Sequence, residues 1–222
     1  NPYYYTDEDG THHYFYDDNG VKRDEDGLGL EYSGIDEGEL QHKITAKNKT
    51  VMKFDVWGYL RRTIDANGNT ISYNYGPNSN GNFLGNVHDG ADRVISFYYN
   101  SDMSRLDKIA DPAGRETLYS YDGNGNLIKI TYADGTDTRF EYSGHRLTKV
   151  VTSNGYSMEY SYTLDMQVPR ISKVLEKKGN ETGQGFKVSY FNGNTTYFTV
   201  PTATGDGNIE TAAGNIRYTY QF

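Results

Sequence analysis

Acidic side chains are the residues of this chain whose types and spacing come nearest to a reactive or metal-binding site. Residues 7–9 and 24–26 both read Asp-Glu-Asp, and a Gly follows each triplet. Calcium binds several carboxylate and carbonyl oxygens that converge from one loop, so these triplets resemble short calcium loops. Both triplets lack the Glu that an EF-hand loop places at its twelfth position. We therefore interpret them as solvated hairpin tips, with a calcium site as the alternative.

Histidines and hydroxyl nucleophiles are present, but their spacing does not favour catalysis. His12 and His13 are adjacent, so a strand would point them to opposite sides, which disfavours joint binding of zinc. The sequence has no His-Glu-x-x-His motif and no Gly-x-Ser-x-Gly elbow. No set of residues has the spacing of complementary catalytic roles. We predict that this chain is not an enzyme and needs no metal or cofactor.

The elements that carry these side chains repeat along the chain. Residues 54–75 and 121–142 are the clearest copies of one unit, in which an aromatic-x-aromatic pair precedes a Gly-rich turn. Repetition with a period of about 20 residues indicates a repeat architecture. The second member of each apolar-x-aromatic pair falls at Tyr16, Tyr32, Phe54, Tyr75, Tyr99, Tyr121, Tyr142, Tyr162, Tyr190 and Tyr220.

Each unit predicts two antiparallel strands joined by tight turns. Side chains alternate with period two, as in residues 138–142, so each aromatic pair faces one side of a strand. Six Asn-Gly and six Asp-Gly dipeptides supply the positive φ angles of hairpin turns. Residues 40–52 are less regular, but we expect them to be extended. Residues 76–86 and 176–185 are polar and Gly/Asn-rich, which predicts exposed loops. The fold class is therefore all-β, built of tandem hairpins whose long sheet is expected to curl.

Composition supports an ordered, Tyr-rich sheet. The chain has 222 residues with 22 Tyr, 9 Phe and 1 Trp, although its mean hydropathy is only -0.81. Disordered chains are poor in aromatic residues. Cys is absent, which excludes disulfides, and no apolar stretch is long enough to span a bilayer. Residues 1–39 hold 12 Asp and Glu but only two basic residues, and this charge disfavours binding of nucleic acid.

The repeated Tyr-Asp pairs have a structural explanation. Asp after a strand accepts hydrogen bonds from backbone N–H groups of the following turn. We assign this role to Asp17, Asp55 and Asp122 rather than a catalytic one. Gly can adopt the left-handed conformation without a steric penalty, which such turns need. Gly20, Gly58 and Gly125 are assigned to these positions.

These residues resemble the YD-repeat family, also called the Rhs repeat, whose motif reads Tyr-Asp-x-x-Gly-x-Leu. Residues 121–127 match the motif fully, residues 54–60 match it with Phe for Tyr, and residues 16–21 are a near match. Several copies in phase, covering most of residues 14–220, make the resemblance specific. The motif residues are Tyr16, Asp17, Gly20, Phe54, Asp55, Gly58, Leu60, Tyr121, Asp122, Gly125 and Leu127.

The resemblance implies a fold and a function. Repeats of this family form a strip of antiparallel sheet that spirals into a hollow shell, which encloses a C-terminal toxin in bacterial Rhs proteins and toxin complexes. In teneurins the shell supports cell adhesion, and Gram-positive relatives are associated with the cell wall. We therefore expect residues 1–222 to be a single domain of about ten irregular repeats, with an acidic N-terminal portion at residues 1–39, excised from a larger secreted or cell-surface protein. Its expected partners are neighbouring repeats or a C-terminal domain of the same polypeptide.

A second hypothesis is an adhesin repeat that binds cell-surface glycan. Aromatic rings stack on sugars, and four rings depart from the regular phase of the pairs. They are Trp57, Tyr59, Tyr98 and Tyr156. The alternative is that these rings pack on cross-strand neighbours. Residues 217–222 also read as a final strand with an unpaired edge, which could pair with another chain in a crystal.

Overall fold

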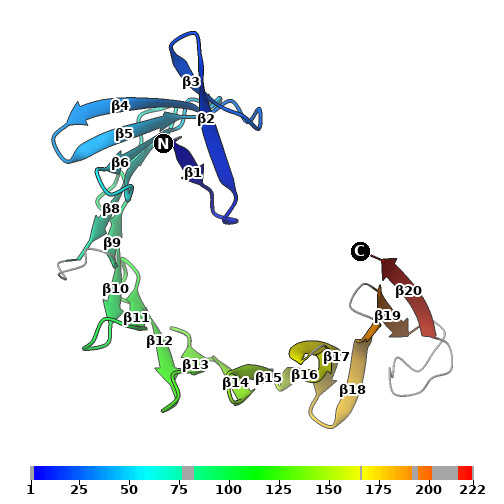
Figure 1. Cartoon of the computed structure of the whole chain (residues 1–222). Coiled ribbons are helices and arrows are strands. Elements are labelled where there is room, and N and C mark those ends of the chain that lie inside the picture. The colour runs from blue at the N-terminus through cyan, green and yellow to red at the C-terminus, as the bar shows by residue number, and fades with distance from the viewer. Residues whose placement is uncertain (1–2, 77–82, 166, 192–194, 202–214, 222) are drawn as a thin grey trace. The chain divides into compact units, whose positions relative to one another are not determined.

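The chain folds as antiparallel β-structure. The computed structural model describes residues 3–76, 83–165, 167–191, 195–201 and 215–221, and these residues form twenty strands and no helix (Figure 1). Every strand pairing described within them is antiparallel and joins neighbours in sequence. The predicted all-β class of tandem antiparallel hairpins is confirmed.

The strands divide between two compact units, Asn1–Arg115 and Glu116–Phe222. Unit 1 contains β1 (Tyr4–Thr6), β2 (His12–Asp18), β3 (Val21–Asp24), β4 (Glu31–Glu37), β5 (Leu40–Thr45), β6 (Val51–Asp55), β7 (Leu60–Ile64), β8 (Thr70–Tyr75), β9 (Leu84–His88), β10 (Val94–Tyr99) and β11 (Leu106–Ala110). Unit 2 contains β12 (Glu116–Tyr121), β13 (Leu127–Thr131), β14 (Asp137–Ser143), β15 (Arg146–Thr152), β16 (Tyr156–Asp165), β17 (Val168–Lys178), β18 (Glu181–Phe191), β19 (Thr195–Pro201) and β20 (Asn215–Gln221). The single domain over residues 1–222 stays a prediction.

A β-bulge recurs at the second aromatic residue of the repeat. In the hairpin of β12 and β13, the register shifts between Ser120 and Tyr121, and Tyr121 then pairs with Leu127. A bulge adds a residue to one strand and strengthens its twist. The same shift places Phe54 opposite Leu60, Tyr75 opposite Leu84, Tyr99 opposite Leu106, Tyr142 opposite Leu147 and Tyr162 opposite Ile171.

The sheet of unit 2 has two chemically different faces. On β14, Phe140 is half-buried and opposes Val150 of β15, whereas the next residue, Glu141, is exposed and opposes Lys149. The charged row continues across β16, where Glu159 contacts Lys149 at 3.2 Å. One face is therefore aliphatic and aromatic, and the other carries paired charges, as the two-residue period of a strand requires.

The N-terminal hairpin folds back over the aromatic face of unit 1. Tyr3 stacks on Tyr32 of β4 with ring centroids 4.5 Å apart, and Tyr5 of β1 meets Phe54 of β6 edge-on at 6.2 Å. Figure 1 shows β1 and β2 beside β4, β5 and β6. The buried cluster beneath them consists of Phe15, Leu30 and Ile44, with Tyr5, Tyr32, Ala46, Met52 and Phe54 packed against it. Complete burial of one such side chain contributes about 1.5–3 kcal/mol, so packing on this cluster stabilises the hairpin.

The prediction of a loop over residues 176–185 is wrong. Strands β17 and β18 continue through this segment and turn at Gly179, where φ is +59°. Residues 178–182 around this turn are exposed, so their polar side chains meet water while the backbones of the two strands stay paired. At Gly185, a Cβ atom would lie 2.4 Å from the carbonyl oxygen of Val174, so the strand needs Gly there.

The other element predictions have mixed outcomes. Residues 40–52 lie in β5, in β6 and in the turn between them, and both strands are extended as expected. The turn is closed by a hydrogen bond from the Ala46 N–H to the Thr50 carbonyl. For the loop predicted at residues 76–86, residues 77–82 lie outside the described residues, and β9 begins at Leu84. The last strand predicted at residues 217–222 falls in β20, which pairs with β19, and residue 222 is not described.

Candidate functional site: an aromatic hollow under the N-terminal hairpin

The turn between β6 and β7, which contains Trp57, is held by the carboxylate of Asp55. Asp55 has no exposed surface, and its Oδ1 accepts the N–H groups of Trp57 at 3.0 Å and Tyr59 at 2.9 Å. The Gly58 N–H donates to the Asp55 carbonyl at 3.0 Å, and Gly58 has a φ of +87°. The Nε of Arg61 donates to Oδ2 at 2.7 Å. The turn thus fixes the backbone position of Trp57.

The same turn recurs along the chain. In each copy, the Asp Oδ1 accepts two N–H groups, from the second and fourth following residues. The copies begin at Asp7, Asp65, Asp89, Asp111 and Asp122. At Asp122, the hydrogen bond from the Asn126 side chain is the main cause that lowers the pKa of the carboxyl below its ordinary value. These carboxylates therefore stay ionised as acceptors, which is a structural role.

Asp17 holds a different turn. Its Oδ1 accepts the Gly20 N–H at 2.9 Å, and β2 and β3 are joined by the two residues Asn19 and Gly20. Their φ values are +53° and +87°, as a two-residue hairpin turn with two left-handed residues requires. Tyr16 is exposed and opposes Arg23.

An aromatic hollow of about 480 Å³ lies between the N-terminal hairpin and β4–β6. Trp57 stands at this hollow with 76% of its surface exposed. Ligand sites of this size are typically concave and mainly apolar, with a few polar groups that fix orientation. The aromatic side chains that line it are Tyr3, Tyr4, Tyr5, Phe15, Tyr32, His42, Phe54 and Trp57.

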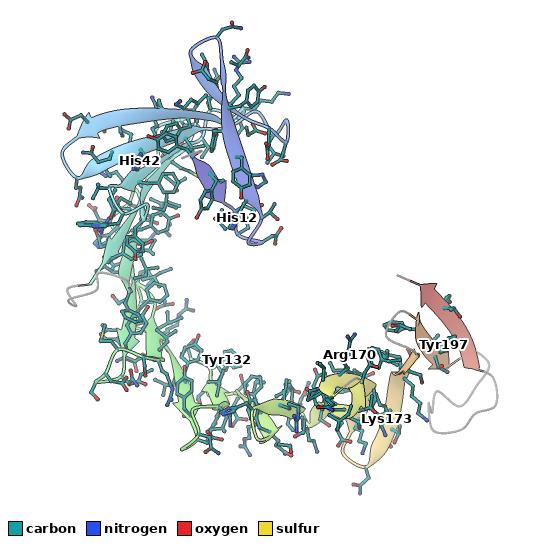
Figure 2. All side chains as sticks on the ribbon, viewed as in Figure 1. His12, His42, Tyr132, Arg170, Lys173 and Tyr197 are labelled. Atoms are coloured by element: carbon teal, nitrogen blue, oxygen red, sulfur yellow. The ribbon has the colours of Figure 1, made fainter. Side chains whose placement is uncertain are left out.

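One hydrogen-bonded pair supplies polarity within the hollow. The Tyr32 hydroxyl lies 3.0 Å from His42 Nδ1. Burial, followed by the hydrogen bond with Tyr3, raises the pKa of Tyr32 to about 12, so its hydroxyl keeps its proton at neutral pH. Figure 2 shows His42 on the strands of the sheet and His12 on the N-terminal hairpin. The hollow thus combines flat rings with a hydroxyl and an imidazole.

The four rings proposed for glycan stacking are not brought together. Of these, only Trp57 lines the hollow. Tyr59 packs on Tyr75 with ring centroids 5.1 Å apart, which is the alternative of packing on a neighbouring ring. The Lys108 ammonium lies over the Tyr98 ring, 4.4 Å from its centroid. In unit 2, the Lys178 ammonium lies over the Tyr156 ring, 5.0 Å from its centroid.

The acidic triplets are not simple solvated tips, which corrects the sequence-based interpretation. His13 is buried, and its two ring nitrogens contact Asp7 Oδ2 at 3.0 Å and Asp26 Oδ2 at 2.7 Å. Asp24 is also buried, and its carboxylate accepts the N–H of Leu30 at 2.6 Å. Among the described residues, no group of three or more His, Asp or Glu is arranged to hold a metal ion.

Sequence reasoning missed the His13 bridge, although one signal was available. His13 and Phe15 share the inward face of β2, and both are buried. A polar residue at an inward position needs partners. Its partners come from two separate turns, which the spacing along the chain does not place together.

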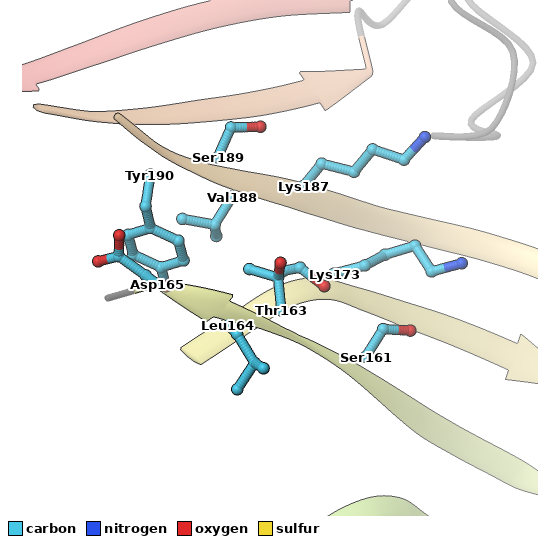
Figure 3. Close-up of a pocket in the computed structure, with 10 residues that line it drawn as sticks. Ser161, Thr163, Leu164, Asp165, Lys173, Lys187, Val188, Ser189 and Tyr190 are labelled. Atoms are coloured by element: carbon cyan, nitrogen blue, oxygen red, sulfur yellow. The ribbon is translucent and has the colours of Figure 1, made fainter. Parts of the chain in front are cut away.

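A second hollow, of about 490 Å³, lies in unit 2 (Figure 3). Lys173 and Lys187 are directly opposite each other on β17 and β18, and their side chains run in the same direction. Ser161, Thr163 and Ser189 contribute hydroxyl groups. This lining is polar and open, so it offers a ligand less apolar burial than the aromatic hollow does.

The described residues contain no helix with the length and apolarity that crossing a membrane requires.

Taken together, these features define a tandem β-hairpin repeat protein in which Asp-held turns and aromatic bulges recur. Residues 105–137 and 121–157 match the family model described as RHS Repeat. The resemblance to the YD or Rhs repeat is therefore confirmed over this stretch.

Bacillus proteins are among the relatives in sequence. The chain is 34% identical over 92 residues to the tRNA(Glu)-specific nuclease WapA of Bacillus subtilis subsp. natto, which covers 37% of this chain and 4% of the relative. It is 33% identical over the same length to the tRNA nuclease WapA of Bacillus subtilis strain 168, with equal coverage. The chain thus spans a very small part of these relatives, and the nuclease activity in their names is theirs.

Similar solved structures come from toxin assemblies. The crystal structure of TcdB2-TccC3 covers 96% of this chain with 15% of its own, at 12% identity and a TM-score of 0.44. That of TcdB2-TccC3-Cdc42 covers 74% of this chain with 11% of its own, at 14% identity and a TM-score of 0.43. At these scores the likeness carries no argument about partners.

Proposed function

We propose that this chain is a structural segment of an exported bacterial RHS-repeat protein, whose sheet forms part of a shell that encloses or displays another part of the same polypeptide. The observation that carries the proposal is the two-faced sheet. In unit 2, an aromatic face and a charged face continue from strand to strand. In this proposal the sheet acts as a wall and as an attachment surface for another part of the polypeptide, and it does not catalyse a reaction.

The half-buried aromatic face supports the proposal. In unit 1 the N-terminal hairpin covers this face above β4–β6, and the resulting cluster is buried. In unit 2, Phe140, Tyr142 and Val150 remain only half-buried. One repeat cannot bury its own apolar face, so repeats depend on neighbours or on a covering segment. Another part of the polypeptide is the covering segment that the proposal requires.

Protease protection of the complete gene product tests the shell. We expect segments outside the repeats to resist digestion in the intact protein and to be cut when residues 105–157 are deleted. Deletion of these residues removes the matched repeats without touching the N-terminal hairpin. Equal digestion in both proteins would contradict enclosure and leave display alone. A gene that encodes neither further repeats nor another domain would contradict both.

A second candidate function is glycan binding, and the aromatic hollow favours it. The exposed Trp57 ring can stack on the apolar face of a sugar, while the Tyr32 hydroxyl and His42 can bond its hydroxyl groups. Each well-placed polar contact adds orientation rather than much affinity. Surface display of a repeat protein would place this hollow where it meets other cells.

A glycan array tests this function with matched variants. We expect binding that falls at least tenfold in Trp57→Ala and is retained in Tyr98→Ala, which removes an exposed ring from β10 away from the hollow. The loss reflects stacking on the indole of Trp57, which is exposed, whereas the rings of Tyr32 and His42 are only partly exposed. Binding that is absent from the array, or lost equally in both variants, would argue against the hollow as a sugar site.

A further inference from the structure

A buried histidine joins two turns of the N-terminal region. His13 of β2 keeps 6% of its surface exposed and lies between Asp7, in the turn after β1, and Asp26, in the segment between β3 and β4. Tyr5 of β1 is the other titratable group against the imidazole, with ring centroids 6.1 Å apart. Tyr5 titrates above pH 10, because burial raises its pKa, so it stays neutral while His13 titrates.

The geometry requires a protonated imidazole. Both ring nitrogens face carboxylate oxygens, at 3.0 and 2.7 Å. A neutral imidazole donates through only one nitrogen and presents a lone pair at the other. That lone pair would face a carboxylate oxygen, which also carries lone pairs. An imidazolium donates to both carboxylates, with charge-assisted bonds that are stronger than neutral ones.

The bridge holds down the segment that covers the aromatic face. The Phe15 N–H donates to the Tyr3 carbonyl at 3.0 Å, and the Glu25 N–H donates to the Tyr14 carbonyl at 3.0 Å. These bonds continue the attachment of β1 and β2 to each other and to the segment after β3. The same hairpin supplies Tyr3 and Tyr5 to the hollow.

We propose that His13, Asp7 and Asp26 form a pH-sensitive clasp that keeps the N-terminal hairpin closed over the aromatic face when His13 is protonated and releases it at alkaline pH. Release uncovers the rings of Tyr32 and Phe54, on which Tyr3 and Tyr5 pack. The proposal concerns the cover itself and holds whether or not the hollow binds sugar.

The direction of the pH dependence follows from the bridge. The hydrogen bonds to Asp7 and then to Asp26 raise the pKa of His13 above its ordinary value of 6.5. A group with a raised pKa in the folded state contributes its full stability below the unfolded value, and this contribution is lost as pH rises through the folded value. With both carboxylates ionised, closure is therefore strongest just below pH 6.5 and weakens as pH rises through the raised pKa of His13.

Hydrogen exchange read by mass spectrometry tests the clasp on the whole chain. Exchange is followed at pH 6 and pH 8.5 and corrected for the intrinsic rate at each pH. We expect protection of peptides from residues 12–18 to fall by about tenfold for each unit by which the pKa of His13 is raised. Peptides from β14 and β15 in unit 2 should keep the same corrected protection at both values.

Two variants separate the clasp from its surroundings. His13→Gln removes the titrating group and should abolish the pH dependence, whereas His12→Gln, which changes the exposed neighbour, should behave as the wild type. If His13→Gln leaves the hairpin open at both pH values, Asp26→Asn provides the test of the clasp. It removes one charge and should move the loss of protection to lower pH. Wild-type protection that is equal at both pH values, a pH dependence that persists in His13→Gln, or an unmoved midpoint in Asp26→Asn would overturn the proposal.

Discussion

Asp55 illustrates how one buried carboxylate can organise a complete turn. Its Oδ1 satisfies two backbone N–H groups, and its Oδ2 accepts the Arg61 guanidinium. Arg61 in turn lies over the Tyr75 ring at 5.0 Å. The carboxylate therefore connects the turn, the following strand β7 and the aromatic pair at the end of β8. Loss of this one side chain would leave two N–H groups and a charge without their partner.

We expect Asp55→Ala to lower the free energy of unfolding of unit 1 by about 3–5 kcal/mol, the usual cost of removing one partner of a buried charged pair. Urea unfolding followed by circular dichroism measures the change. Asp65→Ala is the matched control, because Asp65 holds the same kind of turn at the surface. It should cost clearly less. If the two variants lose the same free energy of unfolding, burial of Asp55 adds nothing to the cost of its removal.

At this scale, the local roles could be predicted from sequence and the long-range ones could not. Left-handed φ values at Gly20, Gly58 and Gly125 follow from turn chemistry within a few residues. The bridge from His13 to Asp26 depends on how two turns meet after the hairpin folds back. The hollow that Trp57 lines depends on the same fold-back, because the hairpin supplies part of its lining.

Among the elements, the bulged hairpin is joined to its predecessor by a tyrosine hydroxyl. Tyr142 of β14 donates to the carbonyl oxygen of Leu127, the first residue of β13, at 2.9 Å. Tyr99 donates to the Leu84 carbonyl at 3.1 Å, and Tyr162 donates to the Leu147 carbonyl at 2.7 Å. The Tyr and the Leu of the repeat motif thus contact each other across neighbouring units. The Tyr hydroxyl supplies this link, which Phe54, the residue in place of Tyr in its own copy, cannot make.

Removal of one hydroxyl measures this link. We expect Tyr142→Phe to lower the free energy of unfolding of unit 2 by about 1 kcal/mol, the net value of a hydrogen bond whose carbonyl partner loses its donor. Tyr132→Phe is the control, because the Tyr132 hydroxyl meets Thr138 at the exposed surface at 3.3 Å. Its effect on denaturant unfolding should be smaller. A Tyr142→Phe protein as stable as the wild type would indicate that the hydroxyl adds nothing to the link.

The strands could largely be predicted because alternation and turn residues are local signals. Residues 176–185 were the exception, since their Gly and polar residues are typical of loops. The close approach of Gly185 to the Val174 carbonyl, which explains that Gly, is visible only once β17 and β18 are paired. The bulge at each aromatic pair likewise belongs to the pairing and not to either strand alone.

For the whole molecule, the described pairings join only strands that follow each other in sequence, and each of the two units contains its own buried residues. Phe15, Leu30, Leu40 and Ile44 are buried in unit 1, and Val174, Leu175 and Val188 in unit 2. Stability of such an array is approximately a sum of repeat and neighbour terms. The sequence predicted repetition because it is periodic, but it did not predict that the acidic N-terminal portion would cover a face of the sheet.

Pairing between successive strands also determines when structure can form during synthesis. Each strand can pair with the strand before it as soon as its own residues have emerged, so the loop that must close is short and its entropic cost is low. Folding can therefore advance from the N-terminus at the pace of the ribosome or of a secretion pore, one hairpin after another. The covering hairpin of β1 and β2 is made before β4–β6, the strands that complete the face that it closes.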